Sequence, residues 1–339
     1  MEVLDVFGVA SDGRNDYWSS VVDYMSPILE LYLDPKVSEI MINRFDHILV
    51  QTGEGQILTE AKFDNEAMLN RFITQIASAL NQKFTAESPI LHARFPDDSR
   101  LCCVHQSLSP RGANITLRIA RSGGGVITPE KMIYNGYMTA EMWNFLVGAY
   151  SDGKNIIFSG NTGSGKTSMM RNLIASLGDQ ERILIVEDTN EINIEHKNVI
   201  NMEAANKKGT STSMEELIQT TLRQFGSKLV VGEIRDALAA NALIQAINTG
   251  VSGCTGSLHA NNAKSAVVRL QYLLSTLGYV KFELAGNLIL TSIDIFVHCD
   301  RSSKTGRRVK EICVVNDQRN GLEDMFVFDE LFLEHKKVK

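Results

Sequence analysis

The sequence predicts a two-part α/β protein, in which a small α+β domain precedes a larger, doubly wound domain. Three observations predict this fold class. After residue 128, short apolar runs alternate with helical patterns, which is typical of buried parallel strands covered by helices. A glycine-rich loop stands between the first of these runs and the next helical pattern. Three consecutive glycines separate this region from the N-terminal part of the chain.

Residues 34–121 are predicted to form the small domain. Segments 38–43 and 47–51 are strand-like and flank a short, turn-rich stretch. A helix follows, with Asp64 as its expected N-cap, because apolar residues recur at helical spacing and predict one buried face. The residues of this face are Leu69, Phe72, Ile73, Ile76 and Leu80.

Two further strands of this domain are predicted at residues 100–108 and 114–119. Successive side chains of a strand point to opposite faces of the sheet. Ile115 and Leu117 are therefore expected to face the core, and Arg118 is expected to face outward.

The stretch Arg121–Gly125, "RSGGG", is the best linker in the chain because it contains three glycines and no apolar residue. We therefore predict a linker at residues 122–128, between the small domain and a C-terminal domain at 129–339. Residues 1–33 are an N-terminal extension, and the sequence leaves their role open.

Residues Gly160 to Thr167, "GNTGSGKT", fit the phosphate-loop pattern G-x-x-x-x-G-K-[ST] between a strand and a helix. Glycines let consecutive backbone N–H groups turn toward one anion, and the helix adds its positive end. Lys166 would reach the β- and γ-phosphates, and the Thr167 hydroxyl would hold Mg²⁺. No NKxD guanine motif follows, so ATP is favoured over GTP. The predicted nucleotide-binding residues of this loop are Thr162, Gly163, Ser164, Gly165, Lys166, Thr167 and Ser168.

Titratable side chains stand at the ends of three other predicted strands. In open α/β sheets, ligands bind at the carboxyl ends of the strands. Glu187 and Asp188 end one strand, and Glu233 ends another, so these acids are candidates for orienting water and Mg²⁺. His259 ends a third strand and is a candidate sensor of the γ-phosphate. The sequence does not decide which acid is the general base.

Composition narrows the class of protein. The chain has 339 residues and a formal net charge of -6, which argues against direct binding of nucleic acid over the whole surface. Its five cysteines form no CxxC pair, which argues against a disulfide framework or a zinc site. The acidic start predicts no signal peptide, and no apolar run approaches membrane-spanning length. We therefore expect a cytoplasmic protein whose membrane association is peripheral.

Four segments together resemble motifs of the type II/type IV secretion ATPase superfamily. They are residues 160–167, 185–192, 229–236 and 248–270, which match that family's Walker A, Asp box, Walker B and His box in order and spacing. "NTG", "LHANNAKS" and "GRRVKEI" are most similar to the TrbB-type ATPases of conjugal transfer, with CpaF-type pilus ATPases close behind. "EIMIN", "ARFPDDSR" and "ITLRI" are similar to the first domain of these proteins, so the resemblance extends from Asp34 to Val315.

The resemblance implies a RecA-like ATPase domain in a homohexameric ring, with ATP between the two domains of a subunit and hydrolysis driving rigid-body motion. It implies that Lys166 and Thr167 bind phosphate and Mg²⁺, while Glu187 and Glu233 activate water and order the metal. The His-box histidine would be His259. The arginines approaching the γ-phosphate would be Arg100 and Arg118. Expected partners are inner-membrane secretion or pilus components, and a coupling ATPase is a further candidate.

The sequence also departs from the family pattern. Val251 replaces the first histidine of the His box, and Gly256 and Ser257 replace two threonines. Residues 223–228, "RQFGSK", replace the family's Arg-x-x-Pro-Asp, and Arg223 retains the arginine. The four zinc-binding cysteines of the pilus-extension branch are absent.

Three functions remain open at this point. The first is an ATP-hydrolysing motor of a conjugative type IV secretion system, which powers apparatus or pilus assembly and substrate transfer. The second is a type IV pilus assembly or retraction ATPase, with the same chemistry and a different partner. The third is a nucleotide-gated assembly scaffold with little turnover.

Overall fold

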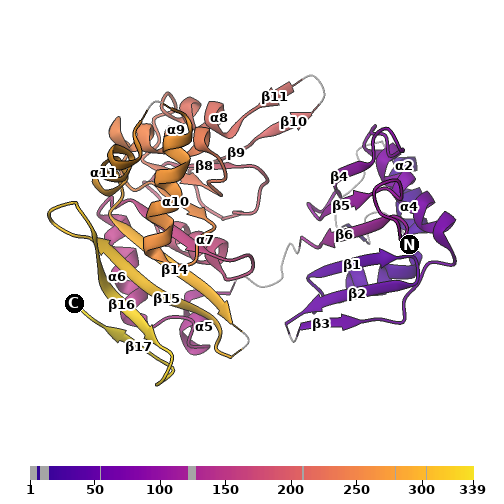
Figure 1. Ribbon diagram of the computed structural model, residues 1–339, viewed down its shortest axis with the longest axis horizontal. Coiled ribbons are helices and arrows are strands. Elements are labelled where there is room, and N and C mark those ends of the chain that lie inside the picture. The colour runs from indigo at the N-terminus through magenta and orange to yellow at the C-terminus, as the bar shows by residue number, and fades with distance from the viewer. Residues whose placement is uncertain are drawn as a thin grey trace. The chain divides into compact units, whose positions relative to one another are not determined.

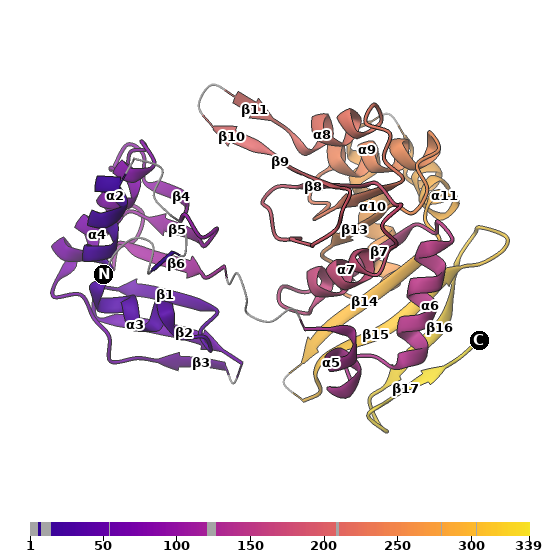
Figure 2. The ribbon, with the colours of Figure 1, turned by 180° about the vertical axis from the view of Figure 1, so that it is seen from behind.

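A computed structural model describes residues 6–7, 15–53, 55–120, 127–207, 210–278, 280–302 and 304–339. The chain divides into two compact units, Met1–Gly125 and Val126–Lys339, drawn in Figures 1 and 2. Most of the predicted linker lies outside the described residues. The predicted fold class is confirmed, with an antiparallel α+β unit first and a larger, mainly parallel α/β unit second.

The first unit is built on an antiparallel sheet in the order β3-β2-β1-β6-β5-β4. Its strands are β1 Glu39–Arg44, β2 His47–Thr52, β3 Gly55–Leu58, β4 Ile90–Arg94, β5 Arg100–Val104 and β6 Asn114–Arg118. Its helical segments are α2 Asn15–Tyr24, η1 Ser26–Ile28, α3 Leu29–Leu33 and α4 Glu66–Ala79. Residues 15–33 belong to the packing of this unit, because Val21, Met25 and Ile28 are buried in its core.

Helix α4 has the predicted apolar face. Leu69, Phe72, Ile73 and Ile76 are buried in the core, as the helical spacing requires. The N-cap is Asn65 and not Asp64, because the Asn65 side chain accepts a hydrogen bond of 3.0 Å from the Met68 N–H. The helix therefore begins one residue later than the sequence predicts.

The second unit contains a sheet in the order β17-β16-β15-β14-β7-β13-β12-β8-β9. The strands from β14 to β9 in this order run parallel, whereas β15, β16 and β17 form an antiparallel edge. The strands are β7 Ile156–Gly160, β8 Ile183–Glu187, β9 Val199–Glu203, β12 Lys228–Val231, β13 Thr255–Leu258, β14 Ile295–Ser302, β15 Gly306–Val315, β16 Leu322–Asp329 and β17 Glu334–Lys337. A separate ribbon pairs β10 Ala205–Lys207 with β11 Thr210–Thr212.

Helices cover both faces of the parallel strands, as Figures 1 and 2 show from opposite sides. One face is covered by α5 Pro129–Tyr134, α6 Ala140–Ser151 and α7 Lys166–Ala175. The other is covered by α8 Met214–Thr221, α9 Ala237–Asn248, α10 Ala263–Thr276 and α11 Phe282–Ser292. Every residue of β7, β8, β12 and β13 is buried, which explains their continuous apolar sequences. Their carboxyl ends meet at one edge of the sheet.

The structure also describes the five cysteines and the apolar character of the helices. Cys103, Cys254, Cys299 and Cys313 are buried, and Cys102 on β5 is partly exposed. All five thiols are free. Within the described parts of the chain, no helix combines the length and apolar character needed to cross a bilayer.

Candidate nucleotide-binding site

The phosphate loop joins β7 to α7 in a backbone conformation that needs glycine. Gly160, Gly163 and Gly165 have φ angles of 145°, 72° and 104°, which side-chain-bearing residues rarely adopt. A Cβ atom on Gly160 would lie 1.9 Å from the Cys299 carbonyl oxygen on the neighbouring strand β14. The loop therefore lies directly against the backbone of β14, and the predicted strand–loop–helix context is present.

Lys166 lies at the first position of α7 and closes the loop on itself. Its Nζ donates hydrogen bonds to the carbonyl oxygens of Gly160, at 2.7 Å, and Asn161, at 3.0 Å. The side chain is buried. The hydroxyl oxygen of Ser164 is also buried and has no hydrogen-bond partner among the described residues. A glycine cradle containing a lysine cation and an unpartnered hydroxyl fits the binding of phosphate oxygens.

Two side chains from distant segments hold carbonyl groups of the loop. The Arg307 Nε, on β15, donates to the Gly163 carbonyl at 2.8 Å, and the Tyr137 hydroxyl donates to the Ser164 carbonyl at 3.1 Å. Arg301 lies opposite Arg307 in the β14–β15 pair. Partial desolvation and the charge of Arg301 lower the pKa of Arg307. Two adjacent cations therefore lie beside the loop, and positive charge of this kind favours an anion by Coulomb attraction.

Sequence reasoning missed Tyr137, Arg301 and Arg307 as site residues. Arg301 lies on β14 and Arg307 lies on β15, and these two strands pair as an antiparallel hairpin. Their place beside the loop follows from the pairing of β14 with β7, which local patterns do not reveal. The segment "GRRVKEI" was a signal for Arg307, whereas no comparable signal marked Tyr137.

Glu187 ends β8 with its carboxylate turned onto its own loop. Its Oε1 accepts hydrogen bonds of 3.1 Å from the N–H groups of Glu191 and Ile192. The side chain is buried and packs on Gly232, where a Cβ atom would lie 2.8 Å from the Glu187 Cγ. These contacts shape the loop after β8, which carries Asp188.

Asp188 begins a row of four polar side chains that crosses the ends of three strands. Its Oδ2 lies 2.9 Å from Arg235, which lies 2.9 Å from the Glu233 Oε2. The other oxygen of Glu233 lies 3.1 Å from the His259 Nε2. The structure therefore brings together Glu233 and His259, both predicted from strand ends, and joins them through Arg235 to Asp188.

The charge state of Glu233 follows from these partners. Burial disfavours its ionised form, but the hydrogen bond and charge of Arg235, with contributions from His259 and Lys166, lower its pKa below the ordinary value. Glu233 is therefore an anion at neutral pH. Its side chain is 24% exposed, so it remains accessible to water.

The two departures from the family's threonines have local explanations. The Ser257 hydroxyl donates to the Gly232 carbonyl at 2.7 Å and ties β13 to the residue before Glu233. A Cβ atom on Gly256 would lie 3.2 Å from both the Val231 carbonyl oxygen and the Ile234 side chain. The serine thus supplies a polar contact at this edge, and the glycine allows close packing beside it.

The two candidate arginines of the first unit are direct neighbours. Arg100 on β5 pairs with Arg118 on β6, and Arg118 pairs with Glu39 on the other side. Arg118 is exposed while Ile115 and Leu117 are buried, so the predicted facing of this strand is confirmed. Glu39, Arg118 and Arg100 therefore lie side by side across β1, β6 and β5.

The residues suited to hold a cation with the nucleotide are Thr167, in the first turn of α7, and the carboxylates of Glu187 and Glu233. Oxygen ligands from a hydroxyl and from carboxylates are the type that Mg²⁺ prefers. Of these groups, the Glu187 carboxylate is engaged by backbone N–H groups.

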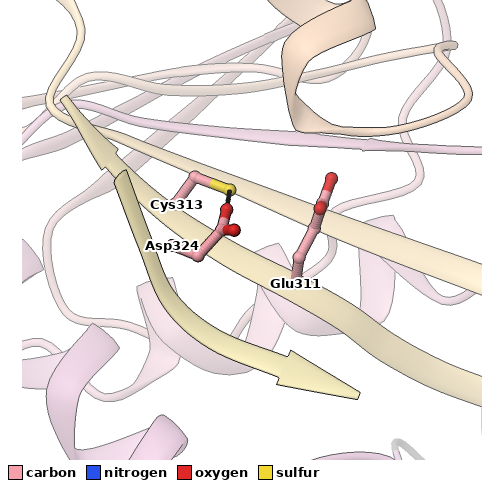
Figure 3. A group of neighbouring side chains, drawn as sticks. All are labelled: Glu311, Cys313 and Asp324. Carbon is pink, nitrogen blue, oxygen red and sulfur yellow. Dashed lines mark hydrogen bonds between the residues drawn. The ribbon is translucent and has the colours of Figure 1, made fainter. Parts of the chain in front are cut away.

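Glu311, Cys313 and Asp324 form another group with metal-binding atoms, within 4.8 Å of one another (Figure 3). The Cys313 thiol donates to the Asp324 carboxylate at 3.3 Å. Burial and the two carboxylates raise the pKa of Cys313. The Glu311 carboxylate accepts from the Ala263 N–H at the start of α10. Glu311 thus ties the start of α10 to β15, and the Cys313–Asp324 contact joins β15 to β16.

Comparisons with known proteins agree with the motif resemblance. The family model described as "Type II/IV secretion system protein" matches residues 23–322. The conjugal transfer protein TrbB of Rhizobium radiobacter is 29% identical over 291 residues, covering 85% of this chain and 86% of TrbB. The type IV secretion system protein VirB11 of Bartonella quintana is 28% identical over 325 residues, covering 85% of this chain and 91% of VirB11.

Among solved structures, the pilus retraction motor PilT with bound ADP has the same fold. Its TM-score is 0.62 at 17% identity, and the match covers 86% of this chain and 84% of PilT. The family match spans nearly the whole chain and confirms the resemblance seen in its four motifs. The chain therefore belongs to the type II/IV secretion system protein family.

Proposed function

We propose that this chain is the ATP-hydrolysing motor of a conjugative type IV secretion system, working as a homohexamer that powers apparatus or pilus assembly and substrate transfer. The observation that supports this most strongly is the phosphate loop beside the Glu233–His259 pair at one sheet edge. Family membership supports ATPase activity in general, and the similarity to TrbB and VirB11 supports the secretion role.

In this proposal, the loop N–H groups and Lys166 bind the β- and γ-phosphates of ATP, and the Thr167 hydroxyl holds Mg²⁺. When bound, Mg²⁺ would neutralise charge on the transferred phosphoryl group. Thr162, Gly163, Ser164, Gly165 and Ser168 complete the binding loop.

We assign Glu233 the task of orienting the attacking water, since it is anionic and partly exposed. His259 holds one of its oxygens, and we propose that it responds to the γ-phosphate. The Glu187 carboxylate is engaged by backbone N–H groups and orders the loop after β8. It would also help to order the metal. Arg100 and Arg118 stabilise negative charge on the γ-phosphate.

The proposed partners are inner-membrane components of the secretion machinery, with a coupling ATPase among them. We propose a cytoplasmic location, peripheral to the inner membrane. A pilus assembly or retraction ATPase is the alternative, supported by the fold shared with PilT. Deletion of the gene in its own host distinguishes them, because loss of plasmid transfer with intact pilus-dependent movement favours the conjugative system.

Steady-state ATP hydrolysis by wild type and Lys166→Ala tests the enzymatic part. We expect the variant to lose at least about 100-fold in turnover, because the lysine charge on the phosphates is removed. Lys154→Ala is the matched control, since Lys154 is 52% exposed and lies before β7, at the opposite end of that strand. Equal turnover in wild type and Lys166→Ala would refute the proposal that this loop carries out ATP hydrolysis.

The scaffold alternative predicts a different result from the same protein. A scaffold would bind ATP and change its assembly state while wild-type hydrolysis remained undetectable. Native mass spectrometry with and without ATP and Mg²⁺ measures that assembly directly.

A further inference from the structure

A phosphate loop binds its anion through backbone N–H groups, so its carbonyl groups must be held facing the other way. The Ser164 carbonyl is held by Tyr137, whose hydroxyl donates to it at 3.1 Å. In a planar trans peptide, the C=O of one residue and the N–H of the next point in opposite directions. A hydrogen bond to the Ser164 carbonyl therefore fixes the direction of the Gly165 N–H.

Tyr137 is itself rigidly placed. It lies between α5 and α6, and its side chain is buried. Its N–H donates to the Met132 carbonyl at 2.8 Å, and its carbonyl accepts from the Val309 N–H of β15 at 2.8 Å. The phenol is thus fixed by a helix on one side and a sheet strand on the other.

The contact between Tyr137 and the loop is close on the side of Gly165 as well. A Cβ atom on Gly165 would lie 2.7 Å from the Tyr137 hydroxyl oxygen, at a residue whose φ angle is 104°. Burial, with Cys299 adding to it, raises the pKa of Tyr137 well above its ordinary value, so the phenol remains a donor throughout the working pH range. The Tyr137 side chain therefore packs directly against the loop at Gly165.

We propose that Tyr137 is a positioning residue for nucleotide binding: its hydroxyl holds the Ser164 carbonyl and thereby aims the Gly165 N–H at the phosphates. This inference rests on the proposed function, because it concerns how the same loop binds ATP. It adds a residue that lies outside the motifs of the family resemblance.

Tyr137→Phe removes the donor and keeps the ring. We expect the Kd for ADP and for ATP, measured by titration with fluorescent nucleotide analogues, to rise roughly tenfold, the effect of losing one buried hydrogen bond. KM should rise in parallel, while kcat changes less than threefold, because the residues proposed to act on water and metal are unchanged.

Tyr150→Phe is the matched control. Tyr150 is fully buried in the same unit, and its hydroxyl has no hydrogen-bond partner among the described residues. Its removal should leave the Kd within twofold of wild type. If Tyr137→Phe acted only by disturbing core packing, Tyr150→Phe would raise the Kd by a similar factor.

The outcomes separate this inference from the proposed function. If wild type binds nucleotide, Lys166→Ala does not, and Tyr137→Phe binds as wild type does, the positioning role is overturned and the ATPase proposal stands. If wild type binds no nucleotide, both are overturned. The titration also yields the number of sites, so a partly unfolded Tyr137→Phe sample lowers that number and leaves the Kd of its folded fraction measurable.

Discussion

At the scale of single residues, the site depends on the connections between charged side chains. Glu233 is held through one oxygen by Arg235 and through the other by His259, so the direction of its carboxylate is set by two strands and a loop. The motif resemblance named Glu233 and His259 separately. Their contact is a property of the folded sheet edge.

Glu233→Gln keeps the shape of the side chain and removes its charge. If Glu233 orients the attacking water, turnover should fall about 100-fold or more, while the Kd for ATP stays within about threefold. Single-turnover hydrolysis and nucleotide titration measure the two quantities. Glu283→Gln, an exposed acid at the start of α11, is the control. Hydrolysis at the wild-type rate in Glu233→Gln would remove Glu233 from the mechanism.

His298 predicts a pH dependence of stability. It is buried on β14, and its Nδ1 lies 3.0 Å from the Ser159 hydroxyl, next to the phosphate loop. Burial lowers its pKa below the ordinary value, so its contribution to stability is complete above about pH 6.5 and is lost as the pH falls through the folded-state pKa.

The free energy of unfolding should therefore decrease below pH 6.5 by up to about 1.4 kcal/mol per pH unit from this residue. His298→Gln should flatten that part of the curve. Urea unfolding at pH 7.5, 6.5 and 5.5 makes the comparison, with His47→Gln, an exposed histidine on β2, as the control. Identical pH profiles for wild type and His298→Gln would show that His298 does not contribute.

At the scale of elements, sequence patterns predict individual strands and helices but not which strands lie side by side. Continuous apolar runs predicted the four strands of the second unit, because both faces of these strands are buried. Apolar residues at helical spacing predicted α4, because one face of this helix is buried. The placement of β14 beside β7 has no local signature, since residues far apart in sequence make that pairing. Arg307, on β15, reaches the phosphate loop through this arrangement of strands.

Helix α7 contains a buried polar residue that links it to the start of the second unit. The Asn172 Nδ2 donates to the Ile127 carbonyl at 2.7 Å, and the asparagine is buried. Asn172→Leu would keep the volume and leave that carbonyl without this donor. We expect a loss of about 1–3 kcal/mol, or several degrees in Tm, for the second unit.

Calorimetry measures this change, with Asn144→Leu on the exposed face of α6 as control. The ADP affinity of folded Asn172→Leu reports whether the link also affects the phosphate loop. An unchanged Tm would mean that the Ile127 carbonyl finds another donor.

At the scale of the whole molecule, the proposed mechanism needs both units. The phosphate loop belongs to the second unit and the Arg100–Arg118 pair to the first. If Arg118 stabilises charge that develops during hydrolysis, Arg118→Ala should lower kcat by at least about tenfold and raise the Kd for ATP by less than about threefold. Arg44→Ala, on β1 of the same sheet and paired with Asp46, is the control.

Assembly provides a second prediction at this scale. Native mass spectrometry with ATP and Mg²⁺ should show a species of six 37.6 kDa subunits, as the family resemblance implies. Arg118→Ala should still assemble if its role is chemical. A monomer under all nucleotide conditions would contradict the ring.

The distribution of thiols has a practical consequence. Four of the five cysteines are buried, and Cys102 is partly exposed on β5, two residues from Arg100 and therefore on the same side of that strand. A maleimide dye should attach to Cys102 alone in the native protein. The chain thus carries its own labelling position next to the arginine pair, and the fluorescence of that dye during turnover would report events in the first unit without any engineered cysteine.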